Sequence, residues 1–261
     1  MKTSDHNRTF TDRDAWDAHW SEINDATELN PAQIYRHRLL TQLVQRFRKS
    51  SDTIIDFGSG QGDLIRMLAP TIKNCRVLGF ELSVTGIAIA RTKTPNAEFY
   101  AIDLQTDDPP YADIQGMGTL GVCSEVIEHL DHPHKFLVNV KKFMAPGSKL
   151  IITVPSGPMN AFERSIGHRQ HFTQESITHL VQMAGLTVFA TYRAGFPFFN
   201  LYKLIAKMRG EKAREDAGAS ANGRPSALLK IVFAVFRLLF KFNFRDSPLG
   251  WQLIVIAENL Q

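Results

Sequence analysis

The chain has 261 residues, of which 44% are apolar and 21% charged, a composition that predicts one large globular domain with a well-covered core. Its two cysteines, Cys75 and Cys123, lie in apolar runs, which indicates free thiols in a reducing compartment and argues against a disulfide framework. The net charge is +4, but residues 196–250 hold ten Lys and Arg against four Asp and Glu, so the cations are too localised for a broad nucleic-acid-binding face.

Residues 1–50 are predicted to form an N-terminal helical cap. A capping-box pattern at Thr11 and Asp14 opens a short helix that places Trp16 and Trp20 on one side. Such rings more often pack than function, although an aromatic helix of this kind can close over a ligand and exclude water.

A second helix is predicted to begin after Asn30, with asparagine as the N-cap and Pro31 in the first turn. Four residues that recur every four positions are expected to form its buried side: Tyr35, Leu39, Leu43 and Phe47. Three arginines of the same stretch are expected to stay exposed: Arg36, Arg46 and Arg48.

From Asp52 onward, short β-branched runs alternate with helical stretches. Strands are predicted at 53–58, 76–82, 97–104, 118–124, 149–155, 186–193 and 251–259. Helices are predicted at 63–69, 85–93, 136–143 and 173–185, the last with Thr173 as its N-cap. This alternation implies an α/β fold with a mainly parallel sheet that is covered by helices on both faces.

Residues 196–248 interrupt the alternation with two predicted helices, at 197–209 and 226–242, joined by a polar segment that we expect to be flexible. Three cations of the second helix share a narrow stripe, and nearly all the remaining circumference is apolar: Lys230, Arg237 and Lys241. The helix is too short and too charged to be a good membrane span.

Four roles are open for this insertion. It can lie in a membrane surface, cover an apolar acceptor pocket, form a homodimer interface, or simply pack on the core. In its first helix, we expect Lys203, Lys207 and Arg209 to be available to anionic lipid headgroups.

A glycine-rich turn follows the first predicted strand, in the stretch Asp56-Phe57-Gly58-Ser59-Gly60-Gln61-Gly62. Glycines at a strand-to-helix turn let a ligand approach the backbone, whose free amides favour a polar or anionic group. A dinucleotide fingerprint would need its third glycine at the position of Asp63. The spacing therefore disfavours a nicotinamide-dependent dehydrogenase.

Acidic residues end the next two predicted strands. Glu81 lies about 20 residues beyond the glycines, where a carboxylate can bind both hydroxyls of a ribose. Asp103 lies at the same sheet edge, where it could accept a hydrogen bond from an adenine amino group. The alternatives are an exposed carboxylate at Glu81 and a turn or N-cap role for Asp103. Together, the three strand ends predict one ligand lying across the carboxyl edge of the sheet.

The ordered motifs DFGSGQGD, FELS, AIDL, SEVIEHL and APGSKLIITVP resemble those of class I S-adenosylmethionine-dependent methyltransferases, over roughly residues 50 to 195. The resemblance implies a Rossmann-like, mainly parallel sheet of seven strands with an antiparallel last strand. In that family the last two strands usually form a hairpin, so the helical insertion before the last strand is a departure from the pattern.

The same resemblance implies which residues bind the cofactor S-adenosylmethionine. Asp56 would lie beneath it, with Glu81 and Leu82 at the ribose, and Asp103 and Leu104 at the adenine. Four residues of the turn would border the methionine part: Gly58, Ser59, Gly60 and Gly62.

The stretch SEVIEHL follows the fourth predicted strand and places Glu125, Glu128 and His129 on one face if the chain turns helical there. By the resemblance, this corner faces the sulfonium methyl group. At that position a protein must align the acceptor, exclude water and remove the acceptor's proton.

The corner resembles a turn in two families, the ubiquinone-biosynthesis O-methyltransferases and the small-RNA 2′-O-methyltransferases. In the RNA enzymes a later histidine completes a divalent metal site. The resemblance implies the metal ligands Glu125, Glu128, His129 and His171, with His168 as a weaker candidate, around Mg, Mn, Fe or Zn. Two alternatives stay open: a metal-free catalytic pair of Glu128 and His129, and a purely structural cluster.

We therefore expect an S-adenosylmethionine-dependent methyltransferase that acts on oxygen of a small-molecule or lipid-linked acceptor. The first residues lack the apolar core of a signal peptide, so we expect a cytoplasmic protein, with contact at the inner face of a membrane left open. RNA ribose 2′-O-methylation and a non-catalytic, membrane-associated adaptor are the alternatives. Residues 51–195 and 249–261 are expected to form the catalytic core.

Overall fold

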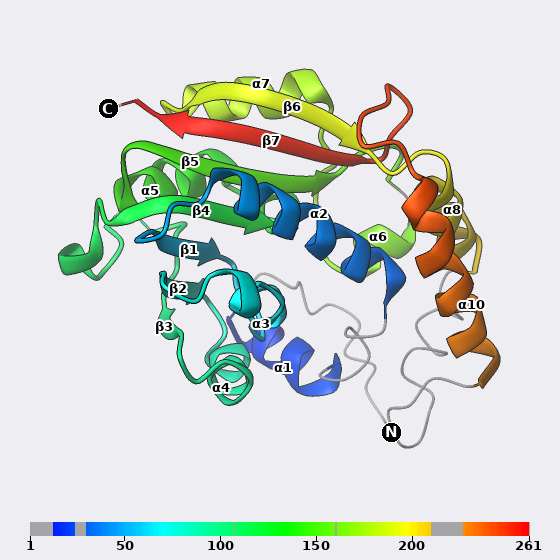
Figure 1. Cartoon of the computed structure of the whole chain (residues 1–261), viewed down its shortest axis with the longest axis horizontal. Coiled ribbons are helices and arrows are strands. Elements are labelled where there is room, and N and C mark those ends of the chain that lie inside the picture. Colours follow the sequence, from blue (N-terminus) through cyan, green and yellow to red (C-terminus); the bar gives the residue numbers. More distant parts are fainter. Residues whose placement is uncertain (1–12, 24–29, 107, 160, 210–226, 261) are drawn as a thin grey trace, which may run out of the picture.

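The structure, a computed structural model, describes residues 13–23, 30–106, 108–159, 161–209 and 227–260 (Figure 1). Within these ranges, one sheet has the strand order β3-β2-β1-β4-β5-β7-β6. The strands are β1 (Thr53–Phe57), β2 (Arg76–Glu81), β3 (Glu98–Ala101), β4 (Gly118–Ser124), β5 (Met144–Pro155), β6 (Thr187–Ala194) and β7 (Gln252–Asn259). The predicted seven-stranded, Rossmann-like α/β fold is confirmed.

Most neighbouring strands are parallel, because helical crossovers join them. Parallel pairing joins β3, β2, β1, β4 and β5 in that spatial order. In contrast, β7 runs antiparallel to both β5 and β6, and Val255 of β7 lies opposite Ile152 on one side and Thr191 on the other. The predicted antiparallel last strand is therefore confirmed. The carboxyl ends of β1 to β4 share one edge of the sheet.

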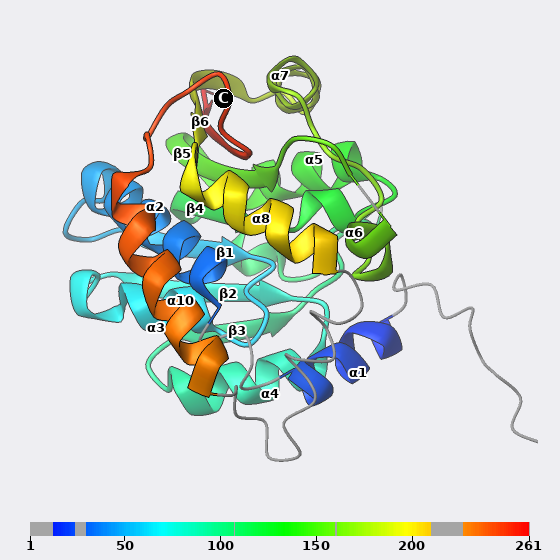
Figure 2. The same cartoon turned by 90° about the vertical axis from the view of Figure 1, so that its right-hand side faces the viewer.

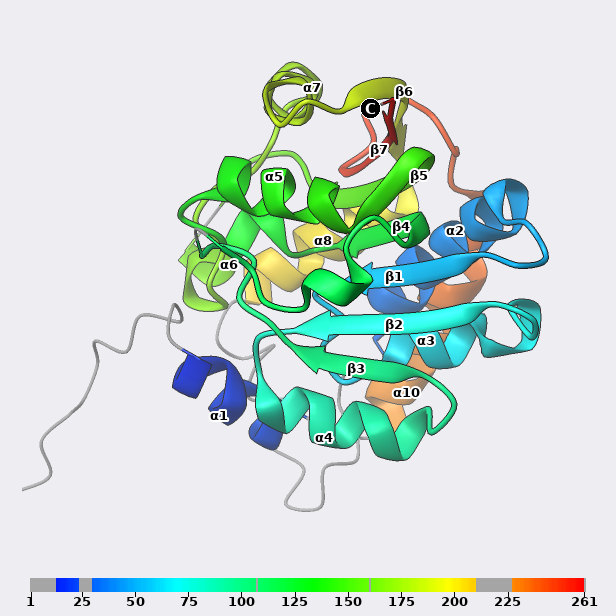
Figure 3. The same cartoon turned by 90° about the vertical axis from the view of Figure 1, so that its left-hand side faces the viewer.

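Helices cover both faces of the sheet. On one face lie α2 (Pro31–Phe47), α3 (Asp63–Leu68) and α4 (Val84–Lys93), and on the other lie α5 (Pro133–Phe143) and α7 (Gln174–Met183). Figure 3 shows β1, β2 and β3 side by side, with α1 (Arg13–Ile23) next to α4. The short helical segments are η1 (Ala69–Thr71), η2 (Ala112–Ile114), η3 (Ile127–His129), α6 (Ala161–Ser165) and η4 (Phe240–Phe242).

The predicted N-caps of α2 and α7 are confirmed. The Asn30 side chain accepts a hydrogen bond from the amide of Ala32 at 2.9 Å. Thr173 and Ser176 form a reciprocal capping box at the start of α7. Each cap satisfies an amide that the helix leaves without a partner and stabilises it by about 1 kcal/mol.

The buried side of α2 differs from the prediction. Leu40 and Val44 are fully buried, whereas Leu39, Leu43 and Phe47 are only partly buried. The physical reason is that α2 contacts two surfaces, the sheet and the inserted helices, so a single stripe with a period of four residues does not describe its packing.

The insertion folds as α8 (Phe198–Arg209) and α10 (Ala227–Leu239), followed by η4, and these helices lie side by side (Figure 2). Their inner sides join α2 in a separate apolar cluster of Ala32, Tyr35, Phe199, Phe236 and Phe240. Among the residues described, no helix is long and apolar enough to cross a membrane. The link predicted to be flexible lies outside the described residues.

The N-terminal helix α1 packs against α4. The carboxylate of Asp17 accepts hydrogen bonds from the hydroxyl of Ser83 and from the amide of Thr85, at the start of α4. Thr11, half of the predicted capping box, lies outside the described residues. The contact places the two tryptophans of α1 over the carboxyl edge of the sheet.

Candidate functional site

A hollow lies at the carboxyl ends of β1 to β4. Five of the residues that the sequence assigns to the cofactor line it: Gly58, Glu81, Leu82, Asp103 and Leu104. The remaining lining residues are Trp16, Trp20, Phe80, Ile102, Gln105, Glu125, Val126, His129, Leu130 and Phe136. Asp56, Ser59, Gly60 and Gly62 belong to the strand and turn beside the hollow and do not line it.

Two glycines of the turn are required by backbone conformation and by space. Gly58 has a φ of 81°, and a Cβ there would lie 2.3 Å from a methyl carbon of Val126. Gly60 has a φ of 53°, and a Cβ would lie 2.6 Å from the ring of Trp20. Both values lie in the left-handed region that glycine adopts without strain, so the turn can pass close beneath the hollow.

The end of β2 holds the glycine turn in place. The amide of Gly58 donates to the carbonyl of Phe80 at 2.8 Å, and the amide of Gly60 donates to Glu81 Oε2 at 2.7 Å. Glu81 Oε1 accepts from the amide of Ser83 at 2.9 Å. These turn amides, which the sequence suggested would be free for a ligand, are thus already hydrogen-bonded. Glu81 both shapes the turn and lines the hollow.

Two buried carboxyl groups lie close to the hollow. Burial, with a further contribution from the charge of Glu81, raises the pKa of Asp56 to about 7. Burial also raises the pKa of Glu81, against the lowering effect of its backbone hydrogen bonds. Both carboxyls would ionise more readily beside a positive charge. The site therefore suits a cationic ligand such as a sulfonium nucleoside.

Part of the lining of the hollow is apolar. Ile102, Leu104 and Phe136 line it, and Asp103 accepts a hydrogen bond from the amide of Gln105 at 2.8 Å. Asp103 therefore fills the turn role that was the alternative to adenine binding, while still lining the hollow. Flat apolar walls beside a polar turn suit a heteroaromatic ring.

The two tryptophans of α1 cover the hollow. Trp16 stands edge-on to His129, with ring centroids 5.2 Å apart. Trp20 stacks near Trp16, with centroids 6.5 Å apart, and lies against Gly60 and Gly86 of the cofactor edge. The two rings thus pack on their neighbours and also line the hollow, and their closing over a ligand to exclude water stays a prediction.

The SEVIEHL corner does not form an α-helix, so the condition for one shared helical face of Glu125, Glu128 and His129 is not met. Glu125 has a φ of 55°, in the left-handed region, directly after β4. Glu128 and His129 follow in the 3₁₀ segment η3. The left-handed residue turns the chain sharply after β4. Glu125 still lines the hollow together with His129, but it is not among the side chains whose donor atoms lie within 4.8 Å of one another.

Glu125 is bound by neighbouring polar groups. Its Oε1 accepts a hydrogen bond from Gln252 at 2.8 Å, and its Oε2 pairs with Arg36 at 3.3 Å. The prediction that Arg36 stays exposed is therefore wrong, because α2 turns this side chain inward, where the carboxylate that follows β4 pairs with it. Glu125 is a predicted metal ligand, and it could bind an ion only by weakening this pair.

Two side chains of the SEVIEHL corner lie close to a histidine from a later loop. One donor atom from each of Glu128, His129 and His168 lies within 4.8 Å of the other two. Glu128 is fully buried, and neither of its oxygens accepts a hydrogen bond from another described residue. Burial, reinforced by the charge of Glu125, raises its pKa well above the usual range. A buried carboxyl group of this kind is suited to binding a cation or to sharing a proton.

The hydrogen bonds of the histidines indicate which of their ring nitrogens carry a lone pair. His171 Nδ1 lies 3.0 Å from the carbonyl of Gly157 and must donate to it, so His171 Nε2 accepts from His168 Nδ1, also at 3.0 Å. His168 Nε2 is therefore unprotonated. His129 contacts the Gly167 carbonyl, and its Nδ1 has no partner among the described residues, so that nitrogen carries its lone pair.

Burial keeps the imidazoles neutral. It lowers the pKa of His129 to about 4 and that of His168 to about 2, and it also lowers the pKa of His171. Neutral rings are the form that binds metals. Of the predicted set, Glu128 and His129 lie together, while His171 orients His168 from behind. His168, the weaker candidate from sequence, is the histidine nearest to them.

The first inserted helix sends cations into the interior, which the sequence did not predict. Lys203 and Lys207 pair with buried Glu163 of α6, at 3.8 Å and 3.0 Å. Glu163 Oε1 also lies 3.7 Å from His171 Nε2. Lys203 and Lys207 are therefore not the headgroup-binding cations that we expected, because the acidic partner lies inside.

A family model described as "Methyltransferase domain" matches residues 32–191. Among curated proteins, the chain is similar to (S)-tetrahydroprotoberberine N-methyltransferase of Eschscholzia californica, with 24% identity over 129 residues. That match covers 49% of this chain and 36% of the relative, so the chain spans only about a third of the curated protein's length.

Solved methyltransferases share the fold. Phosphoethanolamine N-methyltransferase 2 of Haemonchus contortus, in complex with S-adenosyl-L-methionine, has a TM-score of 0.60 and 17% identity, covering 97% of this chain and 59% of that chain. Geranyl diphosphate C-methyltransferase of Streptomyces coelicolor A3(2), in complex with Mg²⁺, geranyl diphosphate and S-adenosyl-L-homocysteine, has a TM-score of 0.56 and 14% identity, covering 85% and 79%. The finer resemblance to ubiquinone or RNA methyltransferases stays a prediction.

Replacing Glu81 with glutamine should weaken the binding of S-adenosylmethionine by about tenfold or more. The amide cannot accept hydrogen bonds through both of its end atoms, so it loses one backbone contact and the charge that would meet the ribose hydroxyls. Isothermal titration measures the affinity, and Glu98→Gln, in an exposed pair with Arg76, is the matched control. Equal affinities for Glu81→Gln and the wild type would remove Glu81 from the cofactor site.

Lowering the pH from about 8 to about 6 should weaken S-adenosylmethionine binding by roughly tenfold, because Asp56 becomes protonated below its pKa of about 7 and no longer attracts the cation. Asp56→Asn should weaken binding and flatten this dependence.

A carboxyl with a raised pKa stabilises the fold while protonated and loses that contribution as the pH rises through 7. Asp56→Asn should therefore raise the melting temperature of the cofactor-free protein more at about pH 8 than at about pH 5. A wild-type affinity independent of pH would contradict the assignment.

Proposed function

We propose that this chain, which belongs to the methyltransferase-domain family and is an S-adenosylmethionine-dependent methyltransferase, methylates an oxygen atom of a small-molecule or lipid-linked acceptor. The observation that supports oxygen is the buried corner of Glu128, His129 and His168 beside the cofactor hollow. A neutral amine can attack a methyl donor without first losing a proton. A hydroxyl is a poor nucleophile until a proton is removed or its pKa is lowered.

The low pKa of His129 bears on how a hydroxyl would be activated. A general base works best when its pKa lies near the working pH, and a value of about 4 leaves His129 a weak proton acceptor. The same burial leaves its Nδ1 lone pair available to a metal at neutral pH. This comparison favours the metal-binding interpretation over the metal-free base.

The donor set fits a divalent ion. Two imidazole nitrogens and one carboxylate suit Mn, Fe or Zn better than Mg, which prefers oxygen ligands. The Glu128 oxygens and His129 Nδ1 have no hydrogen-bond partner from another described residue that would compete with an ion. A bound ion would polarise the acceptor hydroxyl and lower its pKa. The hydrogen bond from His168 to His171 would orient the ring for its ligand role.

The remaining residues would orient and enclose the reactants. Glu125, held by Arg36 and Gln252, fixes the corner beside the hollow. Trp16, which contacts His129, covers it and excludes water. Acidic Asp56 and Glu81 favour the positively charged cofactor over its neutral-sulfur product, which helps product release.

The relatives leave the acceptor atom open, because the names above include N- and C-methyltransferases. RNA ribose 2′-O-methylation remains the second candidate, since the E-V-I-E-H turn resembles that of the RNA enzymes. Its acceptor is also a hydroxyl, so the same corner would serve it.

The test of the proposal is a screen that follows transfer of a labelled methyl group from S-adenosylmethionine to phenols, polyprenyl phenols, amines and short RNAs. We expect a methyl ether as the main product, formed on a phenol or polyprenyl phenol. Methylation of the RNA 3′-terminal ribose would select the second candidate. A main product methylated on nitrogen or carbon would overturn the oxygen assignment.

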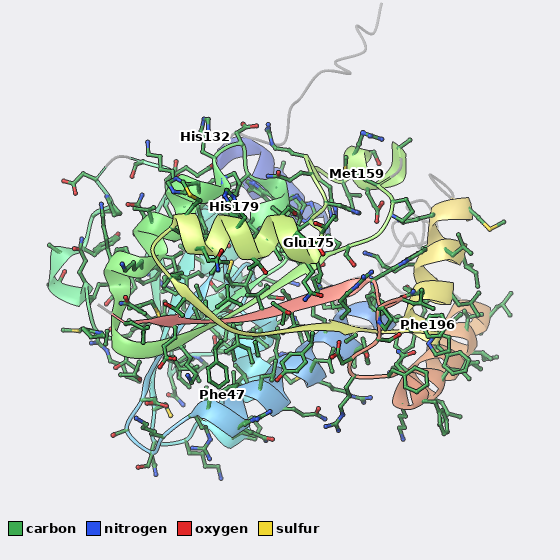
Figure 4. All side chains as sticks on the ribbon, turned by 90° about the horizontal axis from the view of Figure 1, so that it is seen from above. Phe47, His132, Met159, Glu175, His179 and Phe196 are labelled. Carbon is green, nitrogen blue, oxygen red and sulfur yellow. The ribbon has the colours of Figure 1, made fainter. Side chains whose placement is uncertain are left out.

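The metal assignment predicts that excess chelator lowers turnover by about a hundredfold and that Mn²⁺, Fe²⁺ or Zn²⁺ restores it. Independently of activity, titration of Mn²⁺ or Zn²⁺ should show one tight site that Glu128→Gln and His168→Ala each weaken by about tenfold or more. The control is His179→Ala on α7, an exposed histidine labelled in Figure 4. Full turnover in chelator, or equal metal affinity for wild type and His168→Ala, would exclude this site.

A further inference from the structure

Helix α8 has its polarity reversed relative to an ordinary surface helix. Its outward residues occur at helical spacing and are all apolar and exposed: Leu201, Leu204, Ile205 and Met208. The most exposed of them, Met208, has 79% of its surface accessible. Its inward residues include Phe199, Lys203 and Lys207, two of them charged. An amphipathic helix on a water-facing surface has the opposite arrangement.

Helix α10 has three distinct faces. Phe236 and Phe240, on consecutive turns, form the face that packs on α2 and α8. Lys230 and Arg237 lie two turns apart on a second face, with Lys241 of η4 continuing the stripe. The third face is apolar and exposed, and it comprises Leu228, Ile231, Val232, Val235, Leu238 and Phe242. This third face lacks an apolar partner among the described residues.

The two exposed faces belong to one region of the molecule. Of the seventeen large apolar side chains that are exposed among the described residues, twelve lie between Leu201 and Leu249. Tyr202 of α8 packs on Phe236 and Phe240, which holds the helices together. Figure 2 shows both helices next to each other on the side facing the viewer. In Figure 4, Phe196, just before α8, marks the same end of the molecule, away from α7. The exposed apolar faces of these two neighbouring helices are together called the α8–α10 face below.

Among the described residues of the insertion, the exposed charged side chains beside the α8–α10 face are mainly cationic. Lys230, Lys241 and Arg245 are exposed beside it. Within the described parts of the insertion, 196–209 and 227–248, the single acidic residue is Asp246, and its carboxylate already accepts a hydrogen bond from the amide of Arg193. An apolar surface flanked by cations complements the acyl boundary and headgroups of an anionic lipid layer.

We propose that the α8–α10 face binds the surface of a bilayer that contains anionic lipids, with α10 lying in the membrane plane. The apolar third face would enter the acyl boundary, and the stripe of Lys230, Arg237 and Lys241 would lie at headgroup level. A twofold dimer through this face would bring two such cationic stripes towards each other, which disfavours a second copy as the occupant. The proposal does not depend on the acceptor atom or on the metal.

Vesicle flotation tests the proposal with the full chain. Wild-type protein should float with vesicles of phosphatidylcholine and phosphatidylglycerol, mixed at about three to one, and should bind pure phosphatidylcholine at least about tenfold more weakly. The double variant Ile231→Glu/Leu238→Glu should reduce partitioning to the mixed vesicles by about tenfold or more. Both side chains are exposed, so the fold should tolerate the change.

Two further variants distinguish the apolar contribution to vesicle binding from the electrostatic contribution. Met183→Glu introduces a carboxylate at an equally exposed apolar position on α7 and should bind vesicles like the wild type. Lys230→Gln/Lys241→Gln should weaken binding to the anionic vesicles and reduce its salt dependence. Unchanged melting temperature and S-adenosylmethionine affinity show that each variant is folded.

Equal flotation of wild type and Ile231→Glu/Leu238→Glu would overturn the proposal. A wild-type dimer that this variant dissociates, without vesicle binding, would assign the face to a second copy instead.

Discussion

The carboxylate of Glu81 is the interaction on which the geometry of the cofactor edge depends. One oxygen accepts the amide of Gly60 and the other accepts the amide of Ser83, so a single side chain joins the turn after β1 to the start of α4. Ser83 caps α4 by accepting the amide of Gly86, and it also donates to Asp17 of α1. The glycine turn, α4 and the tryptophan helix are thus connected through one buried acid. Such a group is costly to bury unless its hydrogen bonds are made, and here backbone amides make them.

The two glutamates of the SEVIEHL corner have different surroundings. Glu125 is paired with Arg36 and Gln252 and keeps a defined orientation. Glu128, three residues later, is fully buried without such partners, beside two neutral imidazoles. In a purely structural cluster, burying the Glu128 carboxyl and the Nδ1 of His129 without a partner from another described residue would cost several kcal/mol, roughly 1–3 for each group. That cost weighs against the structural alternative, because an ion or a shared proton is what would offset it.

The sequence predicted the fold because its signals are local. Period-two and helical patterns placed the strands and helices, and Asn30 and Thr173 marked helix starts through caps that need only neighbouring residues. The cofactor edge was also predictable, since the carboxyl ends of parallel strands meet at one edge. Arg36 was mispredicted because its partner, Glu125, follows β4 and is far away in sequence. The choice between His168 and His171 depends on a hydrogen bond to Gly157, which no spacing rule reveals. The sequence also mispredicted Lys203 as available to lipid headgroups, because its acidic partner, Glu163, lies on a different helix.

Helix α8 connects the surface of the molecule to the corner. Its outward residues are apolar, while Lys203 and Lys207, on the opposite side, hold Glu163, which lies 3.7 Å from His171 Nε2. His171 in turn fixes the tautomer of His168. An inserted helix whose only role was to present an apolar surface would not need two partly buried cations, each of which loses part of its hydration. A helix that served only the interior would not need four exposed apolar residues. The two requirements together explain why its polarity is reversed, since the side facing the corner is charged and the side facing outward is apolar.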